Sequence, residues 1–222
     1  GSLDTVRTLP SNAPAGTFAF QIGEIVPFYQ NSFDTNPGWT TEGLWAFGHP
    51  TGQGGQFYGN PDPSNGATGE NVYGVNLAGD YSTSPGGPYY VCTDALDLTG
   101  ITQTSVKFRR WLNTDYQWYV YATIHVSNNG TTWTELWNNG GSAIADYGWS
   151  THEYSTLAVA DNQPVVYILW GYQIGSGAWA YSGWNIDDIE IWGLPPMPNA
   201  VGDLNCDGSV DFGDINPFVL TL

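Results

Sequence analysis

Short segments in which apolar and polar residues alternate constrain the fold more than any other feature of this sequence. Residues 105–112 (SVKFRRWL) and 119–127 (YVYATIHVS) each carry one apolar face. Alternation with a period of two is typical of a strand that buries one face. Residues 164–174 (PVVYILWGYQI) are apolar on both faces, which predicts a strand in the middle of a sheet. The Asn-Asn-Gly run at 128–130 predicts a hairpin turn.

The chain between these segments is rich in turn-forming residues and carries no helical pattern. It holds 29 glycines and 14 prolines, and no amphipathic helix of ten or more residues stands out before Pro195. Seven or more short strands without crossover helices predict an all-β fold, an antiparallel two-sheet β-sandwich of jelly-roll type. We expect a polar arm with a Gly-Ser cleavage scar over residues 1–17, the sandwich over 18–193, a Pro-rich linker over 194–201 and a tail over 202–222.

The charge of the chain limits its partners. The net charge is −17 and only four residues are basic, so we expect no nucleic-acid partner. No apolar run approaches the roughly 18 residues needed to cross a bilayer, so we expect no membrane insertion. An acidic surface fits a secreted protein in a calcium-containing extracellular medium or at a cell surface. A bond between the two cysteines, Cys92 and Cys206, is left open because no sequence rule sets their distance.

The tail contains a run, GDLNCDGSVDFGD, in which oxygen-bearing side chains alternate around Gly208. Its candidate calcium ligands are Asp203, Asn205, Asp207, Ser209, Asp211 and Asp214. Calcium takes six to eight oxygens, and alternate residues of a tight loop can all point inward, so the tail predicts a Ca²⁺ site and a short helix after it. The alternative is an acidic turn that binds nothing. Because its last ligand is Asp, the loop resembles a dockerin repeat, which implies half of an attachment module and a cohesin-like partner.

Two further motifs carry a second resemblance. The hairpin VSNNGTTW (126–133) and the strand WNIDDI (184–189) resemble the MAM-like, concanavalin-like jelly rolls of secreted bacterial proteins, including choice-of-anchor domains, over roughly residues 28–193. The resemblance implies a non-catalytic module that accompanies secreted enzymes. It also implies a structural calcium ion between an early loop and the last strand, with Asp34, Asp187 and Asp188 as candidate ligands.

The strand 183–193 can face the core in two ways. If Ile189 and Ile191 point inward, Asp187 does too, and an inward carboxylate must be paired or bind a metal. Arg110 lies on the apolar face of its own segment, so the alternatives are a buried Arg110–Asp187 pair or calcium at Asp187. In the opposite phasing Asp187 is exposed, and the inward residues are Trp184, Ile186 and Trp192.

The sequence offers no set of catalytic residues. Neighbouring carboxylates on a strand, such as Asp187 and Asp188, point to opposite faces and cannot flank one glycosidic bond. The histidines at 49, 125 and 152 form no metal-binding pattern, and no serine nucleophile elbow is present. We therefore expect a protein that is not an enzyme, with a glycan-active enzyme as a less favoured alternative.

Outward residues of two segments form the candidate ligand-binding surface. They are Lys107, Arg109, Trp111, Tyr119, Tyr121 and His125. Aromatic rings offer flat faces to sugars, and two of the basic residues suit an acidic glycan; the alternative is that loops or the second sheet cover this surface. We assign Trp39, Trp45, Trp133 and Trp184 to packing. The sequence thus favours a secreted accessory module that binds polysaccharide or a glycoprotein glycan. The alternatives are a MAM-type adhesion or protein-interaction domain and a purely structural domain of a larger exoprotein.

Overall fold

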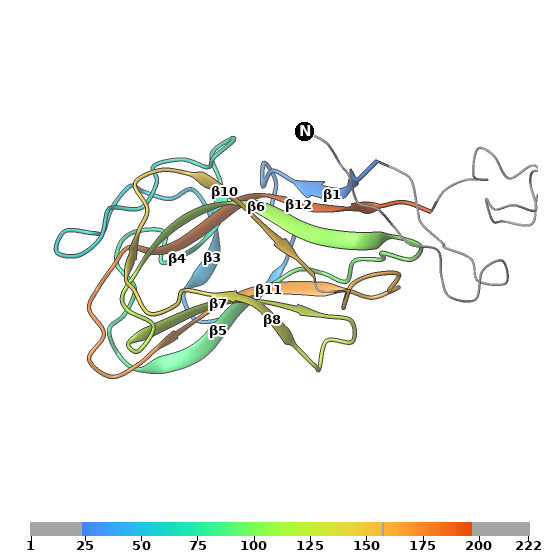
Figure 1. The fold of residues 1–222 in the computed structure, drawn as a ribbon. Coiled ribbons are helices and arrows are strands. Elements are labelled where there is room, and N and C mark those ends of the chain that lie inside the picture. Colours follow the sequence, from blue (N-terminus) through green and yellow to red (C-terminus); the bar gives the residue numbers. More distant parts are fainter. Residues whose placement is uncertain (1–23, 157, 197–222) are drawn as a thin grey trace, which may run out of the picture. The chain divides into compact units, whose positions relative to one another are not determined.

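The computed structural model describes residues 24–156 and 158–196, which form twelve strands and no helix (Figure 1). The strands are β1 (Val26–Asn31), β2 (Thr40–Thr41), β3 (Trp45–Gly48), β4 (Val72–Val75), β5 (Gly86–Cys92), β6 (Thr102–Thr114), β7 (Val120–Ser127), β8 (Thr134–Asn138), β9 (Ile144–Ala145), β10 (Ser150–Ser155), β11 (Tyr167–Ile174) and β12 (Gly183–Leu194). This part of the chain holds no helix long and apolar enough to cross a membrane.

Two antiparallel sheets lie face to face, which confirms the predicted all-β sandwich (Figure 1). The seven-stranded sheet has the order β10-β6-β12-β4-β3, with β1 paired to β12 and β9 paired to β6. The five-stranded sheet has the order β2-β5-β11-β7-β8. β11 lies between β5 and β7, as its two apolar faces predicted. The predicted turn at 128–130 joins β7 to β8, and Gly130 takes the positive φ of 71° that the turn requires.

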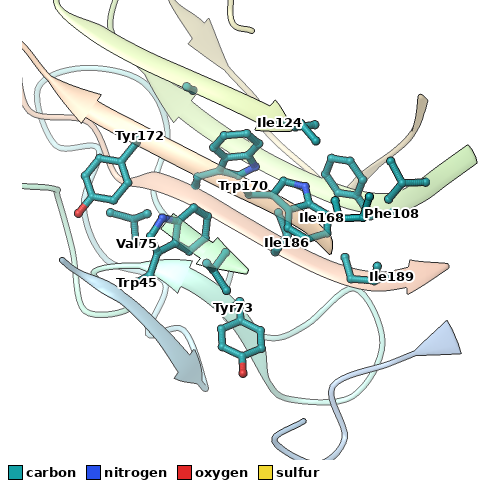
Figure 2. Close-up of a cluster of buried hydrophobic side chains, with 14 of the residues drawn as sticks. Trp45, Tyr73, Val75, Phe108, Ile124, Ile168, Trp170, Tyr172, Ile186 and Ile189 are labelled. Atoms are coloured by element: carbon teal, nitrogen blue, oxygen red, sulfur yellow. The ribbon is translucent and has the colours of Figure 1, made fainter. Parts of the chain in front are cut away.

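The core between the sheets is rich in aromatic side chains (Figure 2). Trp39 stacks on Tyr73 of one sheet and on Trp170 of the other, at ring-centroid distances of 5.3 and 5.9 Å. Trp39, Trp45 and Trp184 are buried, as the packing assignment predicted. Trp133 is half-buried and lies outside this cluster.

β12 faces the core along its whole length because it changes phase at a bulge. Trp184 and Ile186 point inward before the bulge, and Ile189 and Ile191 point inward after it. The pairing of β12 with β6 shifts between 187 and 190. One extra residue moves every later side chain to the opposite face. Each predicted phasing is therefore correct for one half of the strand and wrong for the other.

The loop between β3 and β4, residues 49–71, covers part of the outer face of the seven-stranded sheet. We call it the covering loop. Trp111 donates its indole N–H to the carbonyl of Pro61 at 3.0 Å. Asn185 donates to Asp62 at 2.7 Å, and Asp187 accepts the amide of Ala67 at 2.7 Å. Trp111 of β6 and the outward residues Asn185 and Asp187 of β12 thus bond to this loop.

Candidate functional site

The outer face of the five-stranded sheet carries a groove of about 300 Å³. Its lining residues are Thr40, Glu42, Tyr90, Cys92, His125, Trp133 and Leu169. Strand pairing explains how residues so distant in sequence meet. Thr40 pairs with Cys92, Cys92 with Leu169, Leu169 with His125, and His125 with Glu135, forming one row across all five strands. Period-two alternation turns this row outward while its neighbours fill the core.

Two aromatic side chains border an apolar floor in the groove. A methyl group on Gly171 would lie 2.5 Å from ring carbons of Tyr90, so this ring lies over the glycine. Trp133 comes directly after the β7–β8 turn, and its ring is tilted against Tyr167 at 6.5 Å. Leu169 points outward but is only 6% exposed, because its neighbours in the groove cover it. The groove therefore presents flat apolar surfaces over a closed floor.

Polar groups lie beside these rings in fixed positions. Glu135 accepts hydrogen bonds from the hydroxyl of Tyr121 and from the side-chain amide of Asn138, both at 2.7 Å. His125 Nε2 lies 3.9 Å from the same carboxylate, and its buried Nδ1 has no partner among the described residues. On the other side of the groove, Glu42 accepts the backbone N–H of Tyr90 at 3.2 Å. This arrangement offers hydrogen-bond donors and acceptors whose own orientation is already set.

The charge of the groove is negative. Burial lowers the pKa of His125, although Glu135 opposes this shift, so the imidazole is neutral at pH 7. Burial also raises the pKa of the Cys92 thiol to about 11, with the charges of Asp94 and Glu42 adding to the rise. The hydrogen bond to Glu135 is the main cause that raises the pKa of Tyr121. Glu42 lines the groove, Glu135 pairs across from its residue His125, and the described lining residues include no lysine or arginine.

The structure separates the six predicted ligand-binding residues into two groups. Lys107, Arg109 and Trp111 lie on β6 of the seven-stranded sheet, whereas Tyr121 and His125 lie on β7 of the five-stranded sheet. Tyr119 precedes β7 and is 42% exposed. The single predicted surface is therefore wrong. The chain crosses from one sheet to the other between β6 and β7, so their outward residues lie on opposite sides of the sandwich.

The three basic residues that the structure describes each pair with a carboxylate. Lys107 lies 3.1 Å from Glu190 and over the ring of Trp192, 4.8 Å from its centroid. Arg109 Nε lies 3.9 Å from Asp188.

Arg110 makes a two-pronged pair with Asp146, at 2.9 and 3.2 Å, and lies over the ring of Trp137. The predicted Arg110–Asp187 pair is therefore wrong. Asp146 belongs to the turn between β9 and β10, and strand alternation cannot reveal such a partner.

Asp187 is fully buried and satisfied by backbone amides. Its Oδ2 accepts Ala67 and Thr68 at 2.7 and 3.2 Å, and its Oδ1 accepts Asp188 at 2.7 Å. Burial raises its pKa to about 7, and the charge of Asp188 adds to the rise. Asp187 therefore anchors the covering loop to β12.

The other predicted calcium ligands of the sandwich also have protein partners. Asp34 accepts the hydroxyl of Ser32 at 2.8 Å, and Asp188 accepts that of Thr68 at 2.5 Å. Across residues 24–156 and 158–196, no three His, Cys, Asp or Glu side chains gather as a metal site. Calcium at Asp34, Asp187 and Asp188 stays a prediction. The tail ligands, the cohesin-like partner and the Cys92–Cys206 bond involve residues outside the described part of the chain.

Sequence reasoning missed Trp133, Tyr90 and Glu42 as groove residues. A tryptophan directly after a hairpin turn is one signal that could have drawn attention to Trp133. A second group of exposed rings also went unassigned. Trp179 is 51% exposed and stacks on Tyr58 at 4.3 Å, and Trp118 is 78% exposed.

No family model and no curated protein matches this chain. Among solved structures it is similar to the K3 cleaved adhesin domain of Lys-gingipain from Porphyromonas gingivalis, with 11% identity, a TM-score of 0.44, and coverage of 75% of this chain and 99% of that one. It is also similar to the CBM22-1 xylan-binding domain of Paenibacillus barcinonensis Xyn10C, with 13% identity, a TM-score of 0.43, and coverage of 81% and 100%. For SGBP-B from a xyloglucan utilization locus in Bacteroides uniformis the identity is 10%, the TM-score 0.48, and the coverage 72% and 48%. Because these identities and TM-scores are low, the assignment of a β-sandwich rests on the structure of this chain alone.

Proposed function

We propose that this chain is a non-catalytic, secreted module that binds a polysaccharide in the groove of the five-stranded sheet. The observation that carries the proposal is the combination of Trp133 and Tyr90 with a fixed polar network around Glu135. A sugar ring presents apolar C–H faces and a rim of hydroxyl groups. Aromatic rings can pack against the apolar C–H faces. Oriented carboxylates, amides and hydroxyls can form hydrogen bonds with the sugar hydroxyl groups. The volume of about 300 Å³ is at the lower end for small-molecule sites and fits one or two sugar units of a longer chain.

The electrostatics favour a neutral glycan. Glu42 in the groove and Glu135 beside its residue His125 make this surface anionic, and the described basic residues are paired on other parts of the sandwich. A uronic-acid polymer would meet repulsion from both carboxylates. The sequence-based preference for an acidic glycan rested on placing Lys107 and Arg109 beside Tyr121, and it is replaced here by a preference for neutral polymers.

A test compares the wild-type protein with Trp133→Ala and a matched control, Trp111→Ala. Both changes remove one half-buried tryptophan from an outer face, but Trp111 belongs to the seven-stranded sheet. Affinity electrophoresis in gels containing xylan, β-glucan, mannan, galactan, polygalacturonate or alginate gives the specificity, and calorimetry gives the affinity. We expect wild-type retention by at least one neutral polymer and weaker binding of acidic ones. Loss of Trp133 should weaken binding by at least tenfold, as for a central aromatic contact.

Two results would contradict the proposal. One is the absence of retention by every polysaccharide in the panel. The other is an equal loss of affinity in Trp111→Ala, which would place the ligand elsewhere. If no polysaccharide is retained, the exposed rings of Trp118 and Trp179 favour the second candidate function, an adhesion module that contacts a protein or glycoprotein, and pull-down from culture supernatant would identify its partner.

A further inference from the structure

A group of buried polar side chains lies between the covering loop and the first half of β12, on the side of the sandwich opposite the groove. Asn185 of β12 donates to Asp62 Oδ1 at 2.7 Å, and the Ser182 side chain faces the same carboxyl group. Asp80, from the β4–β5 loop, accepts the amide of Gly55 at 2.6 Å. A methyl group on Gly54 would lie 2.7 Å from Asp80 Oδ1 and 3.0 Å from Ser182 Cβ, so these residues crowd one small volume.

Three buried oxygens in this group have no hydrogen-bond partner among the described residues. They are Asp62 Oδ2, Ser182 Oγ and Asn185 Oδ1. Their residues are 2%, 0% and 0% exposed, respectively. Buried polar atoms without partners are rare in folded proteins, and each is costly. Three of them on adjoining residues indicate a ligand that all three can share.

No basic side chain of the described residues meets this requirement. Lys107, Arg109 and Arg110, the basic residues that the structure describes, pair with Glu190, Asp188 and Asp146. Burial raises the pKa of Asp62 to about 8, with the Asp80 charge adding to the rise. A proton on Asp62 together with the Ser182 hydroxyl is therefore the alternative to a bound cation. The calcium response of the protein decides between the two.

We propose that Asp62, Asp80, Ser182 and Asn185 form a binding site for Ca²⁺. The donor set consists entirely of oxygens: two carboxylates, an amide carbonyl and a hydroxyl, which are the ligands of a hard cation. The two carboxylates balance the double charge of the ion. Backbone carbonyls of the covering loop and water complete a coordination of six to eight. The ion would tie the covering loop and the β4–β5 loop to β12, independently of sugar binding in the groove.

The site is distinct from both places where the sequence predicts calcium. It shares no residue with the tail loop or with Asp34, Asp187 and Asp188. Asp187 anchors the same covering loop a few residues further along, through Ala67 and Thr68, without any partnerless oxygen. This difference allows the two regions to be separated by substitution.

The experiment uses the full chain with Asp203→Ala and Asp207→Ala, which remove two of the calcium ligands predicted for the tail. Thermal unfolding is followed with EDTA and with 1 mM CaCl₂, and Tb³⁺ luminescence is excited through tyrosine, since Tyr81 and Tyr181 adjoin Asp80 and Ser182. We expect calcium to raise the Tm by about 5 °C, as for an ion present well above its Kd. One Tb³⁺ should bind and be displaced by Ca²⁺.

Asp62→Asn in this background should abolish the rise in Tm and weaken Tb³⁺ binding by at least tenfold. Asparagine matches aspartate in size and needs no counter-charge, so the fold should persist; Asp80→Asn gives the same test if it does not. The matched control is Asp34→Asn, an exposed carboxylate, which should keep the full calcium response. No calcium response in the tail-substituted chain, or a response that survives both Asp62→Asn and Asp80→Asn, would overturn the proposal in favour of buried water. A response lost in Asp34→Asn alone would do the same in favour of the early-loop site.

Discussion

The two outer faces of the sandwich differ in what lies on them. On the seven-stranded sheet, the covering loop forms hydrogen bonds with Trp111, Asn185 and Asp187. On the five-stranded sheet, the corresponding outward row from Thr40 to Glu135 borders the open groove. Equivalent alternation in sequence thus yields a loop-covered surface on one side and an open groove on the other. Whether the outward residues of a strand hold a loop in place or line a groove therefore depends on whether a loop covers them.

The largest effect expected from this comparison is on stability, at Gly66 of the covering loop. A methyl group there would lie 2.2 Å from the carbonyl oxygen of Thr68 and 2.7 Å from Asp187 Oδ2. Gly66→Ala should therefore lower the free energy of unfolding by about 3 kcal/mol, the upper range for overpacking. Urea unfolding measures this loss. If the comparison holds, polysaccharide affinity is unchanged in the folded variant; a parallel loss of affinity would show that the two faces are coupled.

The next effect is on binding, at Gly171 beneath the ring of Tyr90. Gly171→Ala would bring a methyl group within 2.5 Å of the ring, which must move away from the groove. We expect a loss of affinity of about tenfold, or 1.4 kcal/mol, with little change in Tm. Gly141→Ala is the control, because a methyl group there meets no atom within 4 Å. Unchanged affinity in Gly171→Ala would remove Tyr90 from the site.

The smallest effect concerns the two described histidines whose pKa is lowered, one from each sheet. Burial lowers the pKa of both His125 and His152, so the folded state holds them neutral while the unfolded state binds a proton near pH 6.5. Their contribution to stability is present above pH 6.5 and is lost as the pH falls below it. His125→Gln and His152→Gln should each reduce the fall in Tm between pH 6.5 and pH 5, by about 2 °C.

The pH dependence of polysaccharide affinity should distinguish His125 from His152. His125 lines the groove, whereas His152 contacts Ser150 and Tyr154 on β10 of the other sheet. Acidification should change polysaccharide affinity in the wild type and in His152→Gln but not in His125→Gln. A pH response of binding that persists in His125→Gln would assign it to the carboxylates of the groove.

The sequence predicted strands well and their partners poorly. Residues 119–127 and the turn at 128–130 correspond to β7 and the β7–β8 hairpin, because alternation and turn chemistry are local. The sheet to which a strand belongs depends on distant pairing, so β6 and β7 were placed side by side although they lie in different sheets. The sequence therefore predicts more of the fold than of the candidate site.

The site was harder to predict because it depends on loops and on cross-sheet rows. Trp133 carries the same sequence signal as a packing residue, and only the pairing of β7, β11 and β5 places it over an open groove. The partner of Arg110 lies in a turn, where no periodicity applies. No glycine or other sequence signal marks the bulge in β12. The structure shows it, together with a positive φ of 48° at Asp188.

The bulge in β12 gives the strand two phases of side-chain alternation, and this affects which sequence changes the domain can accept during evolution. In its first half, the odd-numbered positions are tied to the covering loop, while in its second half the odd-numbered positions fill the core. The covering loop can therefore be lengthened, shortened or exchanged with compensating changes only at the odd-numbered positions in the first half of β12. A regular strand over the same residues, without the bulge, would instead turn Ile189 and Ile191 out into water. Sequence variation is therefore expected to accumulate in the covering loop, and loss of the bulge is expected only together with the deletion of one residue, which keeps Ile189 and Ile191 inside.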